Sequence, residues 1–479
     1  MKRAELIFIP APGIGHIVST IEFAKILINQ NDQMFIKILV MRLPFTPFID
    51  SYTKSLTASQ PNITLIDLPQ VDFPPLDLLA QSVESYVCAV IENQKTHVKK
   101  IVSDIVSSKS TPDSVPLVGI VLDFFCVSMI DIGDEFGLPS FIFLTSGCGF
   151  LSLMLSLPSR HEQIGKEYTS SDSDFSIPGF INPVPARVLP AAVFNKDGGY
   201  DAYVKVAQRF KDAKGIIVNT FFELESYAIE FFNSGRIKTP KVYPVGPVLN
   251  HKGQPHPDMD YNEWNKNLNF LNQQPESSVL FLCFGSAGAF SASQVKELAF
   301  GLEQSGYGFL WSMRVPPIQN EESKFKNPEE MLPEGFLERV RGRGKVCGWV
   351  PQVEVLAHKA IGAFVSHCGW NSILESLWYG MPILTLPIYA EQQLNAFTMV
   401  KQLELAVELR LDYRLQCDIV KAEEVERALR CVMERDNEVR KKVQDMAVMA
   451  RNAVMEGGSS FNSISEFLED LEGNRYGNY

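Results

Sequence analysis

The sequence lacks any apolar run long enough to cross a membrane. Outside the expected strands the longest apolar stretch is residues 150–157, against the roughly 20 residues that a membrane-spanning helix needs. A signal-peptide core is also missing, because Glu5 and Pro10 interrupt the first apolar run. We therefore expect a cytoplasmic protein without a membrane span, in which the glycosylation sequon at Asn62 is idle.

Cysteine is scarce and has no metal-binding pattern. The 8 cysteines are scattered, without a Cys-x-x-Cys pair, which favours a reducing compartment over a disulfide framework. Two Asp-x-Asp triplets, 172–174 and 258–260, have the form that binds a metal in some enzymes. Both stand in loop-like, polar segments and not at the end of a buried strand. We expect no bound metal and no resident cofactor.

Positive charge is in deficit. The chain has 44 basic and 56 acidic residues, a net charge of −12, which disfavours nucleic acid or an anionic membrane as the main partner. A local site for a nucleotide remains compatible with this balance. We expect small-molecule partners and a monomer. A length of 479 residues fits two or three domains.

Short apolar runs that do not alternate with polar residues recur along the chain, separated by segments of helical spacing. This pattern is typical of strands buried on both faces in a doubly wound parallel sheet. The expected strands are residues 6–9, 35–40, 63–68, 118–122, 141–144, 215–218, 279–284, 309–313, 345–347, 363–366 and 383–386. The proline-containing stretch 242–262 is interpreted as an interdomain linker.

These runs fall into two series and predict an α/β protein with two Rossmann-like domains facing a cleft. The first would comprise residues 1–249 and the second residues 250–455. A terminal helical segment would comprise residues 456–479.

Polar side chains gather between Trp349 and Gln392, where strands end and helices begin. A buried strand runs into His367, Cys368 and Gly369, and the following Asn371 and Ser372 are residues that cap helices. A helix N-terminus with free N–H groups attracts phosphate. The next strand is followed by Glu391 and Gln392. Together these features suit a phosphate-bearing ligand with a hydroxyl-rich head.

A possible catalytic pair lies in the first half of the chain. His16 follows the first expected strand, and Asp123 follows the apolar run 119–122, so both fall at the carboxyl edge of the sheet. An Asp at that depth is costly unless it is paired. Imidazole is suited to accept a proton near neutral pH, and a carboxylate would fix its tautomer. We predict that His16 and Asp123 act together as a general base.

Two other functions are alternatives to an enzyme with a His16–Asp123 general base. Gly13-Ile-Gly15 between a strand and a helix hints at a nicotinamide-dependent oxidoreductase. That fingerprint needs a third glycine where Val18 stands and an acidic residue where the second strand ends in Val40-Met-Arg42. A non-catalytic sugar-nucleotide-binding protein is the other alternative. Such a protein is expected to lack His16 or Asp123, and both residues are present.

The residues from Trp349 onward also carry a family resemblance. They read W-x-P-Q, H-C-G-W-N-S, a Glu three residues after that Ser, G-x-P and a closing E-Q. This pattern resembles the signature of plant family 1 UDP-glycosyltransferases, and the likeness extends from about residue 5 to about residue 470. It implies a GT-B fold, with the acceptor bound by the first domain, the donor by the second, and the terminal helix, 456–479, returning to the first domain. The reaction implied is transfer of glucose from UDP-glucose, with inversion, to a hydroxyl of a small apolar or aromatic acceptor such as a flavonoid, a phenol or a terpenoid.

The resemblance also assigns roles to single residues, with His16 and Asp123 as the catalytic pair. It places Trp349 and Val350 at uracil, Gln352 and Glu375 at ribose, and His367, Gly369, Asn371 and Ser372 at the diphosphate, to which Ser286 adds a donor. Trp370, Glu391, Gln392 and Thr145 would hold the sugar, and a Gln at the closing position goes with glucose in that family. Beside His16, the acceptor would meet Phe124, Cys148, Phe150, Phe194, Tyr389 and Ala390.

Overall fold

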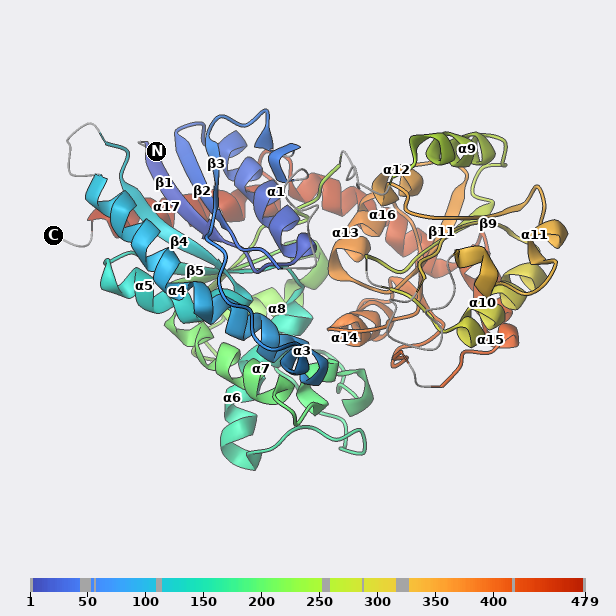
Figure 1. Cartoon of the computed structure of the whole chain (residues 1–479), viewed down its shortest axis with the longest axis horizontal. Coiled ribbons are helices and arrows are strands. Elements are labelled where there is room, and N and C mark those ends of the chain that lie inside the picture. The colour runs from blue at the N-terminus through green and yellow to red at the C-terminus, as the bar shows by residue number, and fades with distance from the viewer. Residues whose placement is uncertain are drawn as a thin grey trace. The chain divides into compact units, whose positions relative to one another are not determined.

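The two parallel sheets of the computed structural model belong to separate units (Figure 1). The structure describes residues 3–43, 53–55, 57–108, 114–251, 259–286, 288–315, 327–415 and 418–476, so Asp258 of the second Asp-x-Asp triplet lies outside the described residues. The first unit comprises Met1–Ala186, Ala191–Asn250 and Asn452–Tyr479. The second comprises Arg187–Pro190 and His251–Arg451. The short segment Arg187–Pro190 therefore groups with the second unit, although the sequence placed it in the first domain.

Among the described residues, the first sheet is entirely parallel and has the order β3-β2-β1-β4-β5-β6-β7. Its strands are β1 (Ala4–Ile9), β2 (Met34–Val40), β3 (Ile63–Asp67), β4 (Leu117–Asp123), β5 (Ser140–Leu144), β6 (Gly215–Val218) and β7 (Lys241–Pro244). The chain order reverses between β1 and β4, and the carboxyl ends of these two neighbouring strands meet at that switch point. Ligands of doubly wound folds bind there.

Helices flank this sheet, and the chain's last helix belongs to the same unit. The helices of this unit are α1 (Ile14–Gln30), α3 (Leu76–Gln81), α4 (Val83–Ser108), α5 (Ile130–Glu135), α6 (Cys148–Ile164), α7 (Gly199–Gln208), α8 (Phe222–Asn233) and α17 (Ser459–Tyr476). Phe467 of α17 packs edge-on against Phe141 and Tyr243, with ring centroids 5.0 and 5.6 Å apart. Burial of this aromatic cluster holds α17 on the sheet.

Strand β7 corrects the predicted linker. Residues 242–244 pair in parallel with β6 instead of forming a connection. Pro244 and the nearby Pro247 obscured the strand in the sequence, but β7 lies at the edge of the sheet, where proline is tolerated because one side needs no ladder hydrogen bonds.

The second sheet repeats the design. Its strands, within the described residues, run in the order β10-β9-β8-β11-β12-β13. They are β8 (Val279–Cys283), β9 (Gly308–Ser312), β10 (Gly344–Cys347), β11 (Ile361–Ser366), β12 (Ile383–Thr385) and β13 (Ala406–Glu408). The switch point falls between β8 and β11. The sequence did not indicate β13, because it has only 3 residues and ends in an exposed glutamate.

The helices of the second unit cover this sheet and extend to the unit's end. They are α9 (Tyr261–Asn272), α10 (Ala292–Ser305), α11 (Phe336–Arg339), α12 (Gln352–Leu356), α13 (Trp370–Trp378), α14 (Gln392–Phe397), α15 (Ala422–Met433) and α16 (Glu438–Ala453). In the part of the chain that the structure describes, no helix combines the length and the apolar character that a bilayer crossing requires.

Candidate active site

In the first unit, His16 and Asp123 form a hydrogen-bonded pair at the switch point. His16 Nδ1 lies 2.7 Å from Asp123 Oδ2, and the two side chains are 27% and 0% exposed. A carboxylate only accepts hydrogen bonds, so Nδ1 carries the proton and donates it. The lone pair of the neutral ring is then on Nε2. The sequence-predicted pair is therefore brought together by the adjacent carboxyl ends of β1 and β4.

Further contacts fix both members of the pair. Asp123 caps the 3-10 turn that follows β4, since its Oδ1 accepts a hydrogen bond of 3.0 Å from the Phe125 N–H. Thr145 Oγ1 lies 3.2 Å from His16 Nδ1. Helix α1 begins at Ile14, so His16 lies in the first helical turn and not in the preceding loop. Its ring is thus held by rigid elements on both sides.

Aromatic rings pack beside the imidazole. The centroids of Phe124 and His16 are 5.8 Å apart, and Phe150 meets Phe124 edge-on at 5.4 Å. Cys148 and Phe150, in the first turn of α6, are buried, whereas Phe194 contacts Tyr168 at 6.5 Å. Of the predicted acceptor residues in this unit, Phe124 is thus the one that touches the His16 ring.

A buried carboxylate anchors the start of α6, and it was not predicted from the sequence. Glu225 accepts hydrogen bonds from the backbone N–H groups of Cys148 and Gly149, at 2.9 and 3.2 Å. Burial raises the pKa of Glu225, and the Cys148 N–H opposes that shift. A Glu inside the apolar run around Phe221 and Leu224 is the signal that was available in the sequence.

In the second unit, β11 turns sharply into α13. Cys368 has a φ of +62°, unusual for a residue other than glycine. Its N–H donates to Ser366 Oγ at 3.1 Å, and its carbonyl accepts from Asn395 Nδ2 at 3.1 Å. These bonds stabilise a strained turn of the kind found at ligand sites.

The start of α13 differs from the prediction in one respect. Gly369 is the N-cap and makes no side-chain cap bond, so Asn371 and Ser372 lie inside the first turn instead of capping it. The N–H groups of that turn and the positive end of the helix dipole favour an anionic ligand.

His367 lies beneath this turn. A Cβ added to Gly285 or Gly369 would come within 2.7 or 2.6 Å of its Nε2, so the ring fits only because both positions are glycine. Burial lowers the pKa of His367 to about 4, although a hydrogen bond with the Cys283 carbonyl shifts the pKa in the opposite direction. The ring is therefore neutral at pH 7, and its Nδ1 has no partner among the described residues.

Gln352, Ser372 and Glu375 form a hydrogen-bonded cluster across α12 and α13. Gln352 Nε2 donates to Ser372 Oγ at 2.9 Å and to Glu375 Oε2 at 2.6 Å. Burial raises the pKa of Glu375 to about 7, although the Gln352 hydrogen bond works in the opposite direction. The two predicted ribose ligands are thus bonded directly to each other, and Gln352 also bonds Ser372, which was predicted to bind phosphate.

The loop after β12 brings Glu391 and Gln392 to the start of α14. Gln392 Oε1 accepts hydrogen bonds from the N–H groups of Ile388 and Tyr389, at 2.9 and 3.0 Å. Ala390 has a φ of +54° in the turn that these bonds hold. Because the oxygen of Gln392 is used within the loop, its amide N–H₂ is the group suited to a ligand.

The remaining predicted donor residues occupy different surroundings. Trp349 is half-buried between β10 and α12, whereas Val350 and Trp370 are buried. Ser286 is exposed after β8. Arg314 donates to the Gly285 carbonyl at 3.0 Å and so fixes the loop that precedes Ser286. Neither Arg314 nor Asn395 was expected from the sequence. The described residues include no group of three or more His, Cys, Asp or Glu side chains able to hold a metal.

Two doubly wound units, one with a histidine–carboxylate pair and one with a helix N-terminus and hydroxyl-binding groups, define a glycosyltransferase of the GT-B class. Comparison with known proteins agrees. The model of the family described as UDP-glucoronosyl and UDP-glucosyl transferase matches residues 236–455.

Full-length relatives show the same relationship. UDP-glycosyltransferase 71K1 of Malus domestica is 52% identical, over 99% of this chain and 100% of that protein. Flavonol 3-O-glucosyltransferase UGT71C4 of Arabidopsis thaliana is 49% identical, over 98% of each chain. The crystal structure of Medicago truncatula UGT71G1 complexed with UDP-glucose is 52% identical, covers 98% of both chains and matches with a TM-score of 0.91. The chain therefore belongs to the plant family 1 UDP-glycosyltransferases, and the nicotinamide alternative is set aside.

Proposed function

We propose that this enzyme transfers glucose from UDP-glucose, with inversion, to a hydroxyl of a small apolar or aromatic acceptor. The observation that carries the proposal is the 2.7 Å hydrogen bond between His16 and the fully buried Asp123. A buried carboxylate beside a partly exposed imidazole is the arrangement of an oriented general base.

In the proposed reaction, His16 Nε2 takes the proton of the acceptor hydroxyl as its oxygen attacks C1 of glucose. The bond between C1 and the diphosphate oxygen breaks, and UDP leaves with the bonding electron pair. Attack opposite the leaving group inverts the configuration at C1. Asp123 stabilises the imidazolium that forms, because its carboxylate already accepts the Nδ1–H bond.

The second unit would hold the donor. The N–H groups at the start of α13, with Asn371, Ser372, His367 and Ser286, would bind the diphosphate. The indole of Trp349, beside the Val350 backbone, offers a flat surface for uracil. Gln352 and Glu375 would bind the ribose hydroxyls, and Trp370, Glu391, Gln392 and Thr145 the sugar. Supporting this assignment, the related UGT71G1 crystal structure was determined with UDP-glucose.

Glucose is the proposed sugar because the signature contains no Lys or Arg beyond Lys359. No Lys or Arg occurs between Lys359 and Lys401, so a sugar carboxylate would meet Glu391 without compensation. An axial O4 would lose one charge-assisted hydrogen bond, which disfavours UDP-galactose by roughly 10- to 100-fold. Values of kcat/KM for UDP-glucose, UDP-galactose and UDP-glucuronate with one acceptor test this, and equal use of galactose would contradict it.

The proposed acceptors are flavonoids, simple phenols or terpenoids, bound beside His16 with Phe124, Cys148, Phe150, Phe194, Tyr389 and Ala390. The aromatic rings next to His16 support a flat acceptor, as does the relative named flavonol 3-O-glucosyltransferase. We further propose that the enzyme acts as a monomer in the cytoplasm. The cysteines of the described residues are free thiols, which suits a reducing compartment.

The proposal is tested by removing the base and its partner separately. Both His16→Ala and Asp123→Asn should lower kcat by about 10²- to 10⁴-fold, because one removes the proton acceptor and the other removes the charge that orients it. Their affinity for UDP should stay near that of the wild type, since the donor groups lie in the other unit. Asp134→Asn, a carboxylate change on α5 of the same unit, is the matched control.

Unchanged turnover in His16→Ala would contradict the assignment of His16 as the general base and would favour a binding protein instead. Product stereochemistry, read from the anomeric proton coupling by NMR, tests inversion independently of the variants.

A further inference from the structure

Glu225 joins two helices of the first unit beside the proposed acceptor site. It lies in the first turn of α8, and its carboxylate accepts hydrogen bonds from the backbone N–H groups of Cys148 and Gly149. These two residues begin α6, whose own N-cap, Gly147, makes no side-chain cap bond. A side chain of α8 therefore caps α6, in the role that a Ser, Thr, Asp or Asn of the same helix usually fills.

This way of capping a helix is a costly one. The Glu225 side chain is buried, and burying a carboxyl group reduces stability unless its oxygens are satisfied. A polar side chain at Gly147 could satisfy one of the same N–H groups without burying a charge. The bonds from Glu225 differ in one respect, because they connect α6 to α8 and so fix the position of α6 as well as its first turn.

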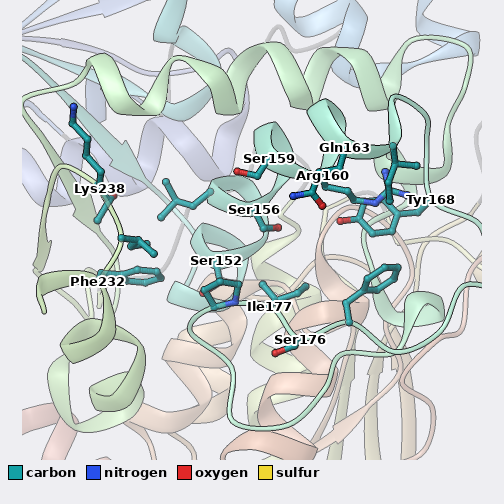
Figure 2. A pocket seen from close by; sticks show the side chains of 16 residues that line it. Ser152, Ser156, Ser159, Arg160, Gln163, Tyr168, Ser176, Ile177, Phe232 and Lys238 are labelled. Atoms are coloured by element: carbon teal, nitrogen blue, oxygen red, sulfur yellow. The ribbon is translucent and has the colours of Figure 1, made fainter. Parts of the chain in front are cut away.

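Beyond its first turn, one face of α6 borders a cavity. The cavity has a volume of about 590 Å³, and Ser152, Ser156 and Ser159 line it from α6 (Figure 2). Phe232, near the end of α8, lines the same cavity. Close packing fixes a helix only where side chains fill the space around it. Along this face the position of α6 therefore depends more on its anchored first turn.

The first turn of α6 also carries part of the proposed acceptor site. At about 100° per residue, Phe150 is on the side of the helix away from the three serines. Its ring meets Phe124 edge-on, with centroids 5.4 Å apart, and the Phe124 centroid lies 5.8 Å from that of His16. A shift of this turn would consequently move the aromatic wall beside the proposed base.

We propose that Glu225 is a positioning residue for the acceptor. Its bonds to the first turn of α6 hold Phe150 against Phe124 and so set the shape of the space beside His16, without contact between Glu225 and the acceptor. This inference rests on the proposed function, which places the acceptor there. Loss of these bonds should weaken acceptor binding and spare UDP, since the donor groups lie in the other unit.

Glu225→Gln tests the proposal, with Glu230→Gln, an exposed residue of the same helix, as the matched control. The amide has one acceptor oxygen, and its N–H₂ group would face one of the two N–H donors. The calorimetric Kd for kaempferol, a flavonoid of the proposed acceptor class, should rise by about 10- to 100-fold. The Kd for UDP should change by less than about 2-fold, and the control should match the wild type in both.

Kinetics should show the same separation. The KM for kaempferol should rise with its Kd, while kcat stays within about 3-fold of the wild-type value. A purely structural role would lower the fraction of folded enzyme, which reduces kcat and leaves Kd and KM unchanged. That result would overturn the proposal.

A double-mutant cycle shows whether Glu225 acts through Phe150. In the Phe150→Leu background, Glu225→Gln should weaken kaempferol binding by less than about 2-fold, because the wall that it positions is already altered. Additive losses would overturn the proposal.

If Glu225→Gln fails to fold, Glu225→Asp decides, because it keeps the charge and shortens the side chain by one methylene group. An unchanged Kd for kaempferol in that variant would reject the role of Glu225. A wild type that binds kaempferol without transferring glucose to it would contradict the proposed function instead, and the comparison of Kd values between the variants would still decide the role of Glu225.

Discussion

At the scale of single residues, burial decides which groups of the donor site carry charge. The pKa of His367 falls to about 4 and that of Glu375 rises to about 7, because burial disfavours the charged form of either group. His367 therefore stays neutral between pH 6 and 8 (approximate bounds of a practical assay), while Glu375 titrates. Ionised Glu375 is the form that would accept hydrogen bonds from the ribose hydroxyls in the proposed donor site.

UDP should consequently bind more tightly as the pH rises through about 7, where Glu375 loses its proton. Calorimetric Kd values for the wild type and Glu375→Gln measure this, because the variant retains the titration of the phosphate and loses that of the carboxyl. Identical pH slopes for the two proteins would contradict the role of Glu375.

The same shift has an opposite consequence for stability. Since the folded-state pKa is raised from 4.5, the stabilising contribution of Glu375 is fully present below about pH 4.5 and is lost as the pH rises through about 7. Glu375→Gln should remove that loss. Chemical denaturation at about pH 5 and about pH 8 would detect this as a smaller difference in the free energy of unfolding between the two pH values.

At the scale of elements, α13 is the proposed phosphate site because its first turn presents backbone N–H groups at the positive end of the helix dipole. The helix is capped by a glycine, which has no side chain to cover that end. The same glycine allows the imidazole of His367 to lie against the backbone.

Gly369→Ala should therefore weaken UDP binding, because the new Cβ would lie 2.6 Å from His367 Nε2. The backbone φ of −62° suits alanine, so the effect isolates the close contact. Overpacking of this kind costs about 1–3 kcal/mol, which corresponds to roughly 5- to 150-fold in Kd.

Gly348→Ala is the matched control, since an added Cβ there meets nothing within 4 Å. Donor affinity and melting temperature should be measured together. Equal Kd values for the two variants would show that the approach of His367 to Gly369 is unimportant for donor binding.

At the scale of the whole molecule, both units follow one plan. Each places its functional groups after the first and fourth strands of its sheet, where the chain order reverses. His16 and Asp123 stand there in the first unit, and Gly285 and His367 in the second. The second site offers N–H, hydroxyl and neutral imidazole groups to the diphosphate.

Such a donor set should stabilise the leaving UDP without a divalent ion, so turnover should survive excess EDTA. The measurement is the initial rate with and without chelator, followed by addition of Mg²⁺ or Mn²⁺. Loss of activity on chelation and its restoration by the ion would contradict this prediction, because it would show that a divalent ion neutralises the charge of the diphosphate.

Most of the sheet architecture and the main site residues were predictable. Apolar runs buried on both faces reveal parallel strands, and parallel topology forces polar residues after β1 and β4 to one edge. For that reason His16 and Asp123 could be paired although 107 residues separate them. Strand β7 was missed because edge strands tolerate proline, and β13 because its 3 residues carry little signal.

The supporting residues were not predictable in the same way. Arg314, Asn395 and Glu225 bind backbone atoms that are 29, 27 and 77 residues away, and no local pattern encodes such partners. Asn371 and Ser372 were predicted to cap α13 because their residue types favour that role, yet the backbone turn at Cys368 and Gly369 starts the helix earlier.

The sequence by itself determined the two parallel sheets, the residue types at their switch points and the family, because periodicity and motif spacing are local. Only the tertiary structure decided that His367 is neutral and that the oxygen of Gln392 is used within its loop. These properties depend on desolvation and on contacts between segments distant in the chain, which exist only once the chain has folded.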